Sequence, residues 1–355
     1  MAFSGPSQRL KETPRRRLPP ARQIIRLVLS LPFRLLRFIL LLPVRLPRYL
    51  WLGWKKGALL LYRLRRWLAR SPEVFRWFRR HAPIERLCHA LYYRLHPARL
   101  GHLIGCLLTR LRGHDVWSAA PGLDVIPKAL RWARQYRRHQ ARFRDIEALR
   151  SILYARQDTF ETRYGPLSIG YLARRYSTRP RWGALLHGMV LYSEAQRVLE
   201  LGTGFGVSGM YLARGLLDVY PVRTCLLITI EREAQFARIA SENFYRLGFH
   251  DFVAVVPGDF EHRLAQALKQ IAPVSLAFID GHHQENAILR DFSQIKARSR
   301  TGTLIVLSGI HQSPGMGRAW RTIKDMPRIA ATVDLWRWGI VVVGNGPPRH
   351  VCARL

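Results

Sequence analysis

The sequence predicts an α/β fold with a doubly wound, mostly parallel sheet that follows a basic helical region. Residues 197–214 are typical of a buried strand, a glycine turn and the start of a helix in direct succession. Strand-length apolar runs then alternate with amphipathic segments up to residue 343. Acidic residues end four of these runs, at the edge of such a sheet where ligands bind.

Charge divides the chain into parts. The net charge is +35, and residues 1–100 carry 23 Lys and Arg against 3 acids. We predict a disordered basic tail over 1–22, a basic amphipathic helical region over 23–112 and a linker over 113–127. Residues 128–355 then form the α/β domain, with a helical lid over 128–195.

The basic region predicts an anionic partner. Within 23–70, arginines interrupt every apolar run long before the roughly 20 residues that a spanning helix needs. Tryptophans and snorkelling arginines instead favour a helix lying in the plane of an anionic membrane. An accessory helical domain with a solvated arginine face and an RNA-binding arm are the alternatives. Four scattered cysteines favour a cytoplasmic protein, peripheral on the inner face of the membrane.

The glycine turn indicates a cofactor with a cationic head group. Gly202, Gly204 and Gly206 follow the first strand, and Glu200 precedes them by two residues. This G-x-G-x-G spacing differs from the G-x-G-x-x-G of dinucleotide folds. A carboxylate in this position would repel a pyrophosphate, whereas it would hold a cationic amino-acid group.

The next strand ends point to a nucleoside. The strand over 225–230 ends at Glu231, which can accept hydrogen bonds from both ribose hydroxyls. After the strand over 252–256, Asp259 can accept the adenine amino group, with Phe260 beside the ring. The strand over 274–279 ends at Asp280.

The chain ends with two strands over 332–343, which favours a seventh strand inserted antiparallel beside a sixth. The segments LELGTGFG, IDGHH and IHQSPGMGRAW complete a pattern that resembles class I S-adenosylmethionine (SAM) dependent methyltransferases of the O-methyltransferase-like group, over about 146–343. The resemblance implies a Rossmann-like seven-stranded sheet in the order 3-2-1-4-5-7-6, and SAM as cofactor. It assigns residues to each part of SAM: Glu200, Gly202, Thr203, Gly204 and Gly206 to the methionine end, Glu231 to the ribose, Asp259 and Phe260 to the adenine, and Asp280 to the point where acceptor and sulfonium meet.

One departure from this group concerns metal. Related catechol-type enzymes hold Mg²⁺ with the acid at Asp280 and an acidic pair after the fifth strand. Ser308 and Gly309 occupy those two positions here. Because Mg²⁺ prefers several oxygen ligands, we expect no metal site, or weak binding at most.

Methyl transfer to a hydroxyl also needs a proton acceptor. We expect it among Asp280, His283, His282 and His311, which lie near strand ends. The resemblance implies a SAM-dependent methyltransferase, metal-independent, that acts on an oxygen of a small-molecule or lipid-linked acceptor. An RNA methyltransferase with a basic arm and a non-catalytic SAM-binding protein are the alternatives. The sequence indicates neither the acceptor nor the oligomeric state.

Overall fold

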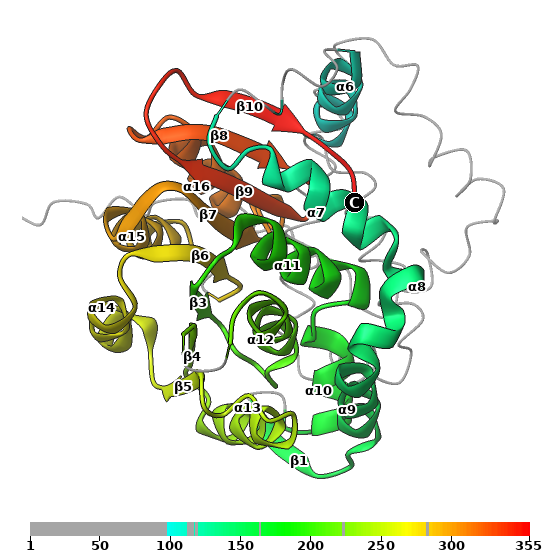
Figure 1. Cartoon of the computed structure of the whole chain (residues 1–355). Coiled ribbons are helices and arrows are strands. Elements are labelled where there is room, and N and C mark those ends of the chain that lie inside the picture. The colour runs from blue at the N-terminus through cyan, green and yellow to red at the C-terminus, as the bar shows by residue number, and fades with distance from the viewer. Residues whose placement is uncertain (1–97, 112–116, 118–119, 163–164, 222–223, 282–283) are drawn as a thin grey trace, which may run out of the picture. The chain divides into compact units, whose positions relative to one another are not determined.

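The computed structural model describes residues 98–111, 117, 120–162, 165–221, 224–281 and 284–355 (Figure 1). The predictions for the tail 1–22 and for residues 23–97 fall outside these ranges, as do those for His282 and His283. The described residues all belong to one unit, residues 55–355. None of the helices within the described ranges reaches the length and hydropathy that a bilayer crossing requires.

An eight-stranded sheet organises the domain. Its strands are β3 (Arg197–Leu201), β4 (Leu226–Glu231), β5 (Val253–Pro257), β6 (Val274–Ile279), β7 (Ser299–Ser308), β8 (Ile329–Asp334), β9 (Trp338–Val343) and β10 (Arg349–Cys352). They lie in the order β10-β8-β9-β7-β6-β3-β4-β5, and only β9 runs antiparallel to its neighbours. With β3 to β9 numbered 1 to 7 and the sheet read from β5, the order is 3-2-1-4-5-7-6. The predicted strand order is confirmed.

Strand β10 is an addition to the predicted seven strands. It pairs in parallel with β8, with Val351 opposite Val333. Only Val351 of its four residues is buried, so the segment carries almost no apolar pattern. Its carboxyl end lies at the same edge of the sheet as the carboxyl ends of the other parallel strands.

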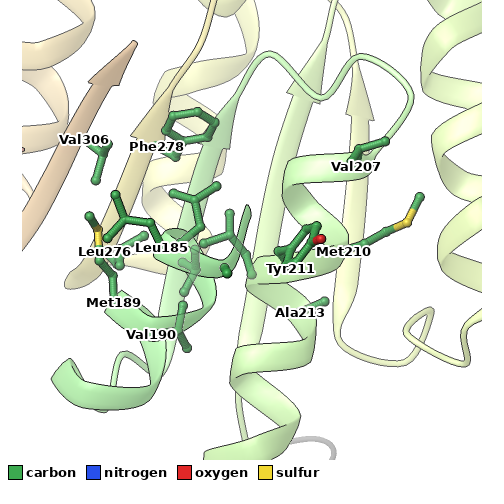
Figure 2. Close-up of a cluster of buried hydrophobic side chains, with 14 of the residues drawn as sticks. Leu185, Met189, Val190, Val207, Met210, Tyr211, Ala213, Leu276, Phe278 and Val306 are labelled. Atoms are coloured by element: carbon green, nitrogen blue, oxygen red, sulfur yellow. The ribbon is translucent and has the colours of Figure 1, made fainter. Parts of the chain in front are cut away.

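Helices cover both faces of the sheet. One face is covered by α11 (Pro180–Ser193), α12 (Val207–Val219) and α13 (Ala234–Arg246), and the other by α14 (Phe260–Ile271), α15 (Glu285–Ala297) and α16 (Pro314–Lys324). Figure 2 shows part of the first core, to which Met189 of α11, Tyr211 of α12 and Phe278 of β6 all contribute buried side chains. Side chains of β3 alternate between the cores, with Val198 in the first and Leu199 in the second, as the period of a strand dictates.

The segment before the sheet is mostly helical. It contains α7 (Val125–Arg134), α8 (Tyr136–His139), the 3₁₀ helix η3 (Gln140–Phe143), α9 (Arg144–Ala155) and α10 (Ile169–Tyr176). Helix α7 begins inside the predicted linker because Val125 and Ile126 are buried. Within the range predicted as a helical lid, 128–195, the structure has two strands, β1 (Thr159–Thr162) and β2 (Gly165–Ser168). They form an antiparallel hairpin. The alternating exposure along β1 suits a strand, and Gly165 has a φ of +92° at the turn.

A buried hydrogen-bond network on Glu147 fastens α9 to α12. The hydroxyl of Tyr211 in α12 donates to Glu147 in α9 at 2.6 Å, and the buried Arg150 donates to the same carboxylate at 2.9 Å. Helix α6 (Ala98–Leu111) belongs to the predicted helical region 23–112 and lies against β10. Its Gly105 allows close approach, because a Cβ there would lie 2.6 Å from Sγ of Cys352.

The contact between α11 and α12 depends on Gly183. A Cβ at this position would lie 2.4 Å from the buried Tyr211 ring. We therefore expect Gly183→Ala to lower the free energy of unfolding by about 1–3 kcal/mol, as overpacking does, measured by urea denaturation. Gly317→Ala is the matched control, since its nearest atom would be 3.8 Å away and alanine favours a helix. Equal stability of the two variants would contradict the packing argument.

Candidate active site

The predicted site residues converge because the strand ends are joined by backbone hydrogen bonds. The N–H of Gly202, which follows β3, donates to the backbone carbonyl of Ile230 in β4 at 3.0 Å. On the other side, the N–H of Asp280 donates to Leu201 at 2.8 Å. Loops that are far apart in the sequence therefore meet at the carboxyl edge of β4, β3 and β6.

The glycine turn needs glycine for two reasons. Gly202, Gly204 and Gly206 have φ of +97°, +52° and +86°, in the left-handed region that side chains disfavour. A Cβ on Gly202 would also lie 2.5 Å from the carbonyl oxygen of Asp280. Gly204 differs, because a Cβ there would meet no atom within 4 Å. The backbone at Gly204 thus faces open space, just before α12 begins at Val207.

Glu200 is fully buried beneath this turn. Its Oε2 accepts a hydrogen bond of 2.7 Å from the hydroxyl of Thr229, and Thr203 lies 2.5 Å from that same hydroxyl. Its Oε1 has no hydrogen-bond partner in the described part of the chain. Burial raises the pKa of Glu200 to about 8, against the opposing effect of the Ser208 and Thr229 hydroxyls. The carboxylate of Glu200 has few hydrogen-bond partners of its own. A cation that reached Oε1 would therefore stabilise its ionised form.

Glu231 and Asp259 differ in environment. Glu231 is buried, and its two oxygens accept from the N–H groups of Gly204 at 2.7 Å and Glu233 at 2.9 Å. Burial raises its pKa, while these N–H groups lower it. Asp259 is about half-exposed, and Nε of Arg232 lies 3.9 Å from its carboxylate. Of the two, Glu231 is the one held rigidly against the glycine turn.

Phe260 is buried, in contrast to the exposed ring that stacking on an adenine would favour. A Cβ on Gly281 would lie 2.2 Å from its ring, so the ring supports the corner that follows Asp280. Its predicted contact with adenine stays a prediction.

Asp280 lies at the end of β6 and is partly buried. Burial raises its pKa to about 6, and a hydrogen bond from Ser308 opposes this rise. Ser308 is the residue that stands where related proteins carry an acid, and here it serves Asp280 as a donor. Across the sheet it is paired with Trp338, whose ring lies 4.5 Å from Trp182 and 4.9 Å from Phe278.

His311 is held by an aspartate that the sequence analysis did not identify. Its Nε2 lies 2.7 Å from Oδ2 of Asp334, at the carboxyl end of β8, and its ring stacks on Trp336 at 4.5 Å. His102 of α6 approaches the other oxygen of Asp334 at 3.1 Å. The histidines lower the pKa of Asp334, although burial opposes them. The signal that found the other acids, a carboxylate at a predicted strand end, misses Asp334, because the sequence predicts strands over 332–343 and the observed β8 ends at Asp334.

The described residues contain no group of three or more His, Cys, Asp or Glu side chains arranged to hold a metal ion. The expectation of no Mg²⁺, or weak binding at most, stays a prediction.

An aromatic contact joins the hairpin to the glycine turn. Phe160 of β1 lies 4.8 Å from Phe236 of α13, and Phe236 lies 4.5 Å from Phe205 in the turn, between ring centroids. Asn243 of α13 also donates to the carbonyl of Phe205 at 3.0 Å. The hairpin is thereby packed against the glycine turn through α13.

Comparison with known proteins agrees with this arrangement. Residues 199–308 match a family model described as a methyltransferase domain. Residues 199–308 are thus similar to methyltransferase domains, and the sheet has the strand order that the resemblance to class I methyltransferases implies. The matched residues include Glu200, the glycine turn, Glu231, Asp259 and Asp280.

Curated relatives of the methyltransferase domain bear related names. A catechol O-methyltransferase of Niastella koreensis is 31% identical over 136 residues, which are 38% of this chain and 58% of that protein. A catechol O-methyltransferase of Mycobacterium tuberculosis is 32% identical over 125 residues, 35% of this chain and 52% of that protein. The chain thus spans about half the length of the curated relatives it matches.

Among solved structures, the O-methyltransferase from Bacillus cereus in complex with SAH is 25% identical, with a TM-score of 0.39. The match covers 47% of this chain and 83% of that one.

The buried carboxyl of Glu200 makes the stability of the methyltransferase domain depend on pH. With a folded pKa of about 8 against an ordinary value of 4.5, Glu200 keeps a proton in the folded state that the unfolded chain releases. Its contribution is fully present below about pH 4.5 and is lost as pH rises through about 8. We expect Glu200→Gln to flatten the fall in urea midpoint between these values, with Asp280 and Glu231 supplying the remaining slope. The exposed Glu261→Gln should keep the wild-type slope, and a Glu200→Gln profile parallel to it would contradict the assignment.

Proposed function

We propose that this methyltransferase domain transfers a methyl group from SAM to an oxygen of a small-molecule or lipid-linked acceptor. The observation that carries the proposal is the buried Glu200 beside the glycine turn. Its Oε1 has no hydrogen-bond partner among the described residues, and the turn faces open space at Gly204. The names of the relatives favour an oxygen acceptor over the RNA and non-catalytic alternatives.

The residues present fit SAM. Glu200 would hold the α-ammonium group, and the N–H groups that begin α12 would face the carboxylate. Glu231 keeps lone pairs after accepting two backbone N–H groups, so it can also accept ribose hydroxyls. Asp259 is accessible enough to accept the adenine amino group.

SAM supplies an electrophilic methyl carbon on a sulfonium when it is bound. The protein's own contribution is to align the acceptor oxygen, exclude water and accept a proton. Asp280, with a pKa of about 6, is ionised at neutral pH yet basic enough to accept a hydroxyl proton. His311, oriented by Asp334, and His282 and His283 are the other candidate acceptors.

Ser308 and Gly309 fit metal-independent chemistry. The hydroxyl of Ser308 donates to Asp280. The N–H of Gly309, which has a φ of +71°, donates to the backbone carbonyl of Arg337 at 2.7 Å.

We further propose a cytoplasmic protein that binds the inner face of the membrane through residues 23–70. The support is the sequence pattern of those residues, which lie outside the described part of the chain. Such binding would present the domain to a lipid-linked acceptor.

SAM binding to the full-length chain, measured by calorimetric titration, tests the cofactor assignment. We expect Glu231→Ala to weaken binding by about tenfold or more, because it removes a charged acceptor from two hydroxyls. Glu233→Ala changes the neighbouring, half-exposed acid and should bind as wild type does. No binding by the folded wild-type chain would overturn the proposed function.

Proton release distinguishes the role of Glu200. At pH 7 a carboxyl group with a pKa of about 8 is mostly protonated, and a neighbouring ammonium would lower that pKa. We therefore expect SAM binding at pH 7 to release up to about one proton in the wild type, and distinctly less in Glu200→Gln. Titration in buffers of different ionisation enthalpy measures this number. Equal release by both proteins would place the ammonium elsewhere.

A further inference from the structure

A cavity of about 300 Å³ lies between α6, α7 and the end of β10, outside the site described above. Arg131 and Arg134 of α7 and Arg354 after β10 line it on one side. Trp117, Pro127 and Leu130 supply an apolar wall. This size is at the lower end of the range for small-molecule sites.

Hydrogen bonds between its walls hold the cavity open. The guanidinium of Arg134 donates to the carbonyl of Arg354, which joins α7 to the end of the chain. The N–H of Cys352 donates to the hydroxyl of Thr109 at 3.3 Å, which joins β10 to α6. The N–H of Ala353 donates to the carbonyl of Asp334 at 3.0 Å, which continues the sheet. Three separate segments are thereby fixed around one space.

The charge of the cavity is positive. Among the described residues that line it, none is Asp or Glu. Arg131 and Arg354 are exposed and form no ion pair within the described part of the chain. Unpaired guanidinium groups around one cavity favour a phosphate, which they can bind through paired hydrogen bonds.

The cavity opens at the ligand-binding edge of the sheet. Because β10 runs parallel to β8, Cys352 lies opposite Asp334 at the carboxyl end. Five strand steps separate β10 from β3, which is about 24 Å at the usual strand spacing. The cavity is therefore distinct from the glycine turn, on the side of the sheet where Asp334 holds His311.

Helix α6, which lines the cavity on one face, carries exposed apolar residues on its other face. Ile104, Leu107 and Leu108 of α6 are 50%, 56% and 47% exposed, and their spacing places them on one face of the helix. His102 and Cys106, on the opposite face, are buried. This apolar face therefore points away from the cavity, which Cys106 lines, and the apolar wall of the cavity itself is what would meet the apolar part of a ligand.

We propose that this cavity binds the phosphate of an anionic amphiphile, with the first carbons of its apolar part against Trp117, Pro127 and Leu130. A phospholipid in a bilayer and a soluble amphiphilic phosphate share this chemistry. The site does not depend on the methyltransferase activity proposed above.

Titration of the full-length chain with a short-chain phosphatidic acid, kept below its micelle concentration, tests the site. We expect the double variant Arg131→Gln/Arg354→Gln to bind about tenfold more weakly than wild type, since it removes two guanidinium groups. Arg137→Gln, which removes an exposed arginine beyond the end of α7, should bind as wild type does. Equal affinity of the double variant and this control would overturn the proposal.

Glycerol phosphate serves as the probe without an apolar part, and it should bind more weakly than the short-chain lipid. Equal affinity for the two would overturn the role of the apolar wall. Bound lipid should also slow the reaction of Cys352, which lines the cavity, with a small methanethiosulfonate, as read by mass spectrometry. An unchanged rate at saturating lipid would place the ligand elsewhere.

Vesicles containing phosphatidic acid separate the two sources. If a bilayer is the source, the double variant should bind vesicles less than Arg137→Gln does. Equal vesicle binding, together with weakened binding of the short-chain lipid, would assign the cavity to a soluble amphiphilic phosphate.

Discussion

A fully buried carboxyl group, that of Glu200, is the constraint around which this domain is built. Glu200 lies in the middle strand of the cofactor half of the sheet, with β4 and β6 on its two sides and a helical layer on each face. Its charge can be satisfied only by Thr229, Ser208 and whatever reaches Oε1. The glycine turn follows from the same requirement, because only a backbone without side chains lets a ligand approach so deeply buried an oxygen.

The strands and the acids around the turn could be predicted because burial leaves a clear trace in the sequence, whereas the strand order was implied by the resemblance to class I methyltransferases. Parallel strands covered on both faces carry unbroken apolar runs, so the acids at their ends stand out. Strand β10 leaves no such trace, since Val351 is its only buried residue. The β1–β2 hairpin is equally short, and its Phe160 is placed by an aromatic contact with α13 that sequence spacing does not reveal.

Asp334 shows a different limit of the sequence analysis. It stands within an apolar segment that predicts strands, and its importance depends on His311 and on His102, which is more than 200 positions away. The arginine cavity has the same character, since Arg131 and Arg354 are ordinary charged residues until folding places them around one space. Contacts between side chains that are far apart in the sequence leave no local pattern in it. An acid at the end of a buried strand does leave one, because an apolar run precedes it.

The exchange of an acid for Ser308 changes the electrostatics at Asp280. Glu200, Glu231 and Asp280 are three acids whose pKa values are all raised by burial. Further acids after β7 would raise them more unless a cation were bound, because like charges disfavour ionisation. A serine instead donates a hydrogen bond that favours the ionised form of Asp280. Ser308 thus supports the ionised carboxylate of Asp280 through a neutral hydrogen-bond donor. The carboxyl edge of the sheet already carries enough negative charge to attract a cationic ligand.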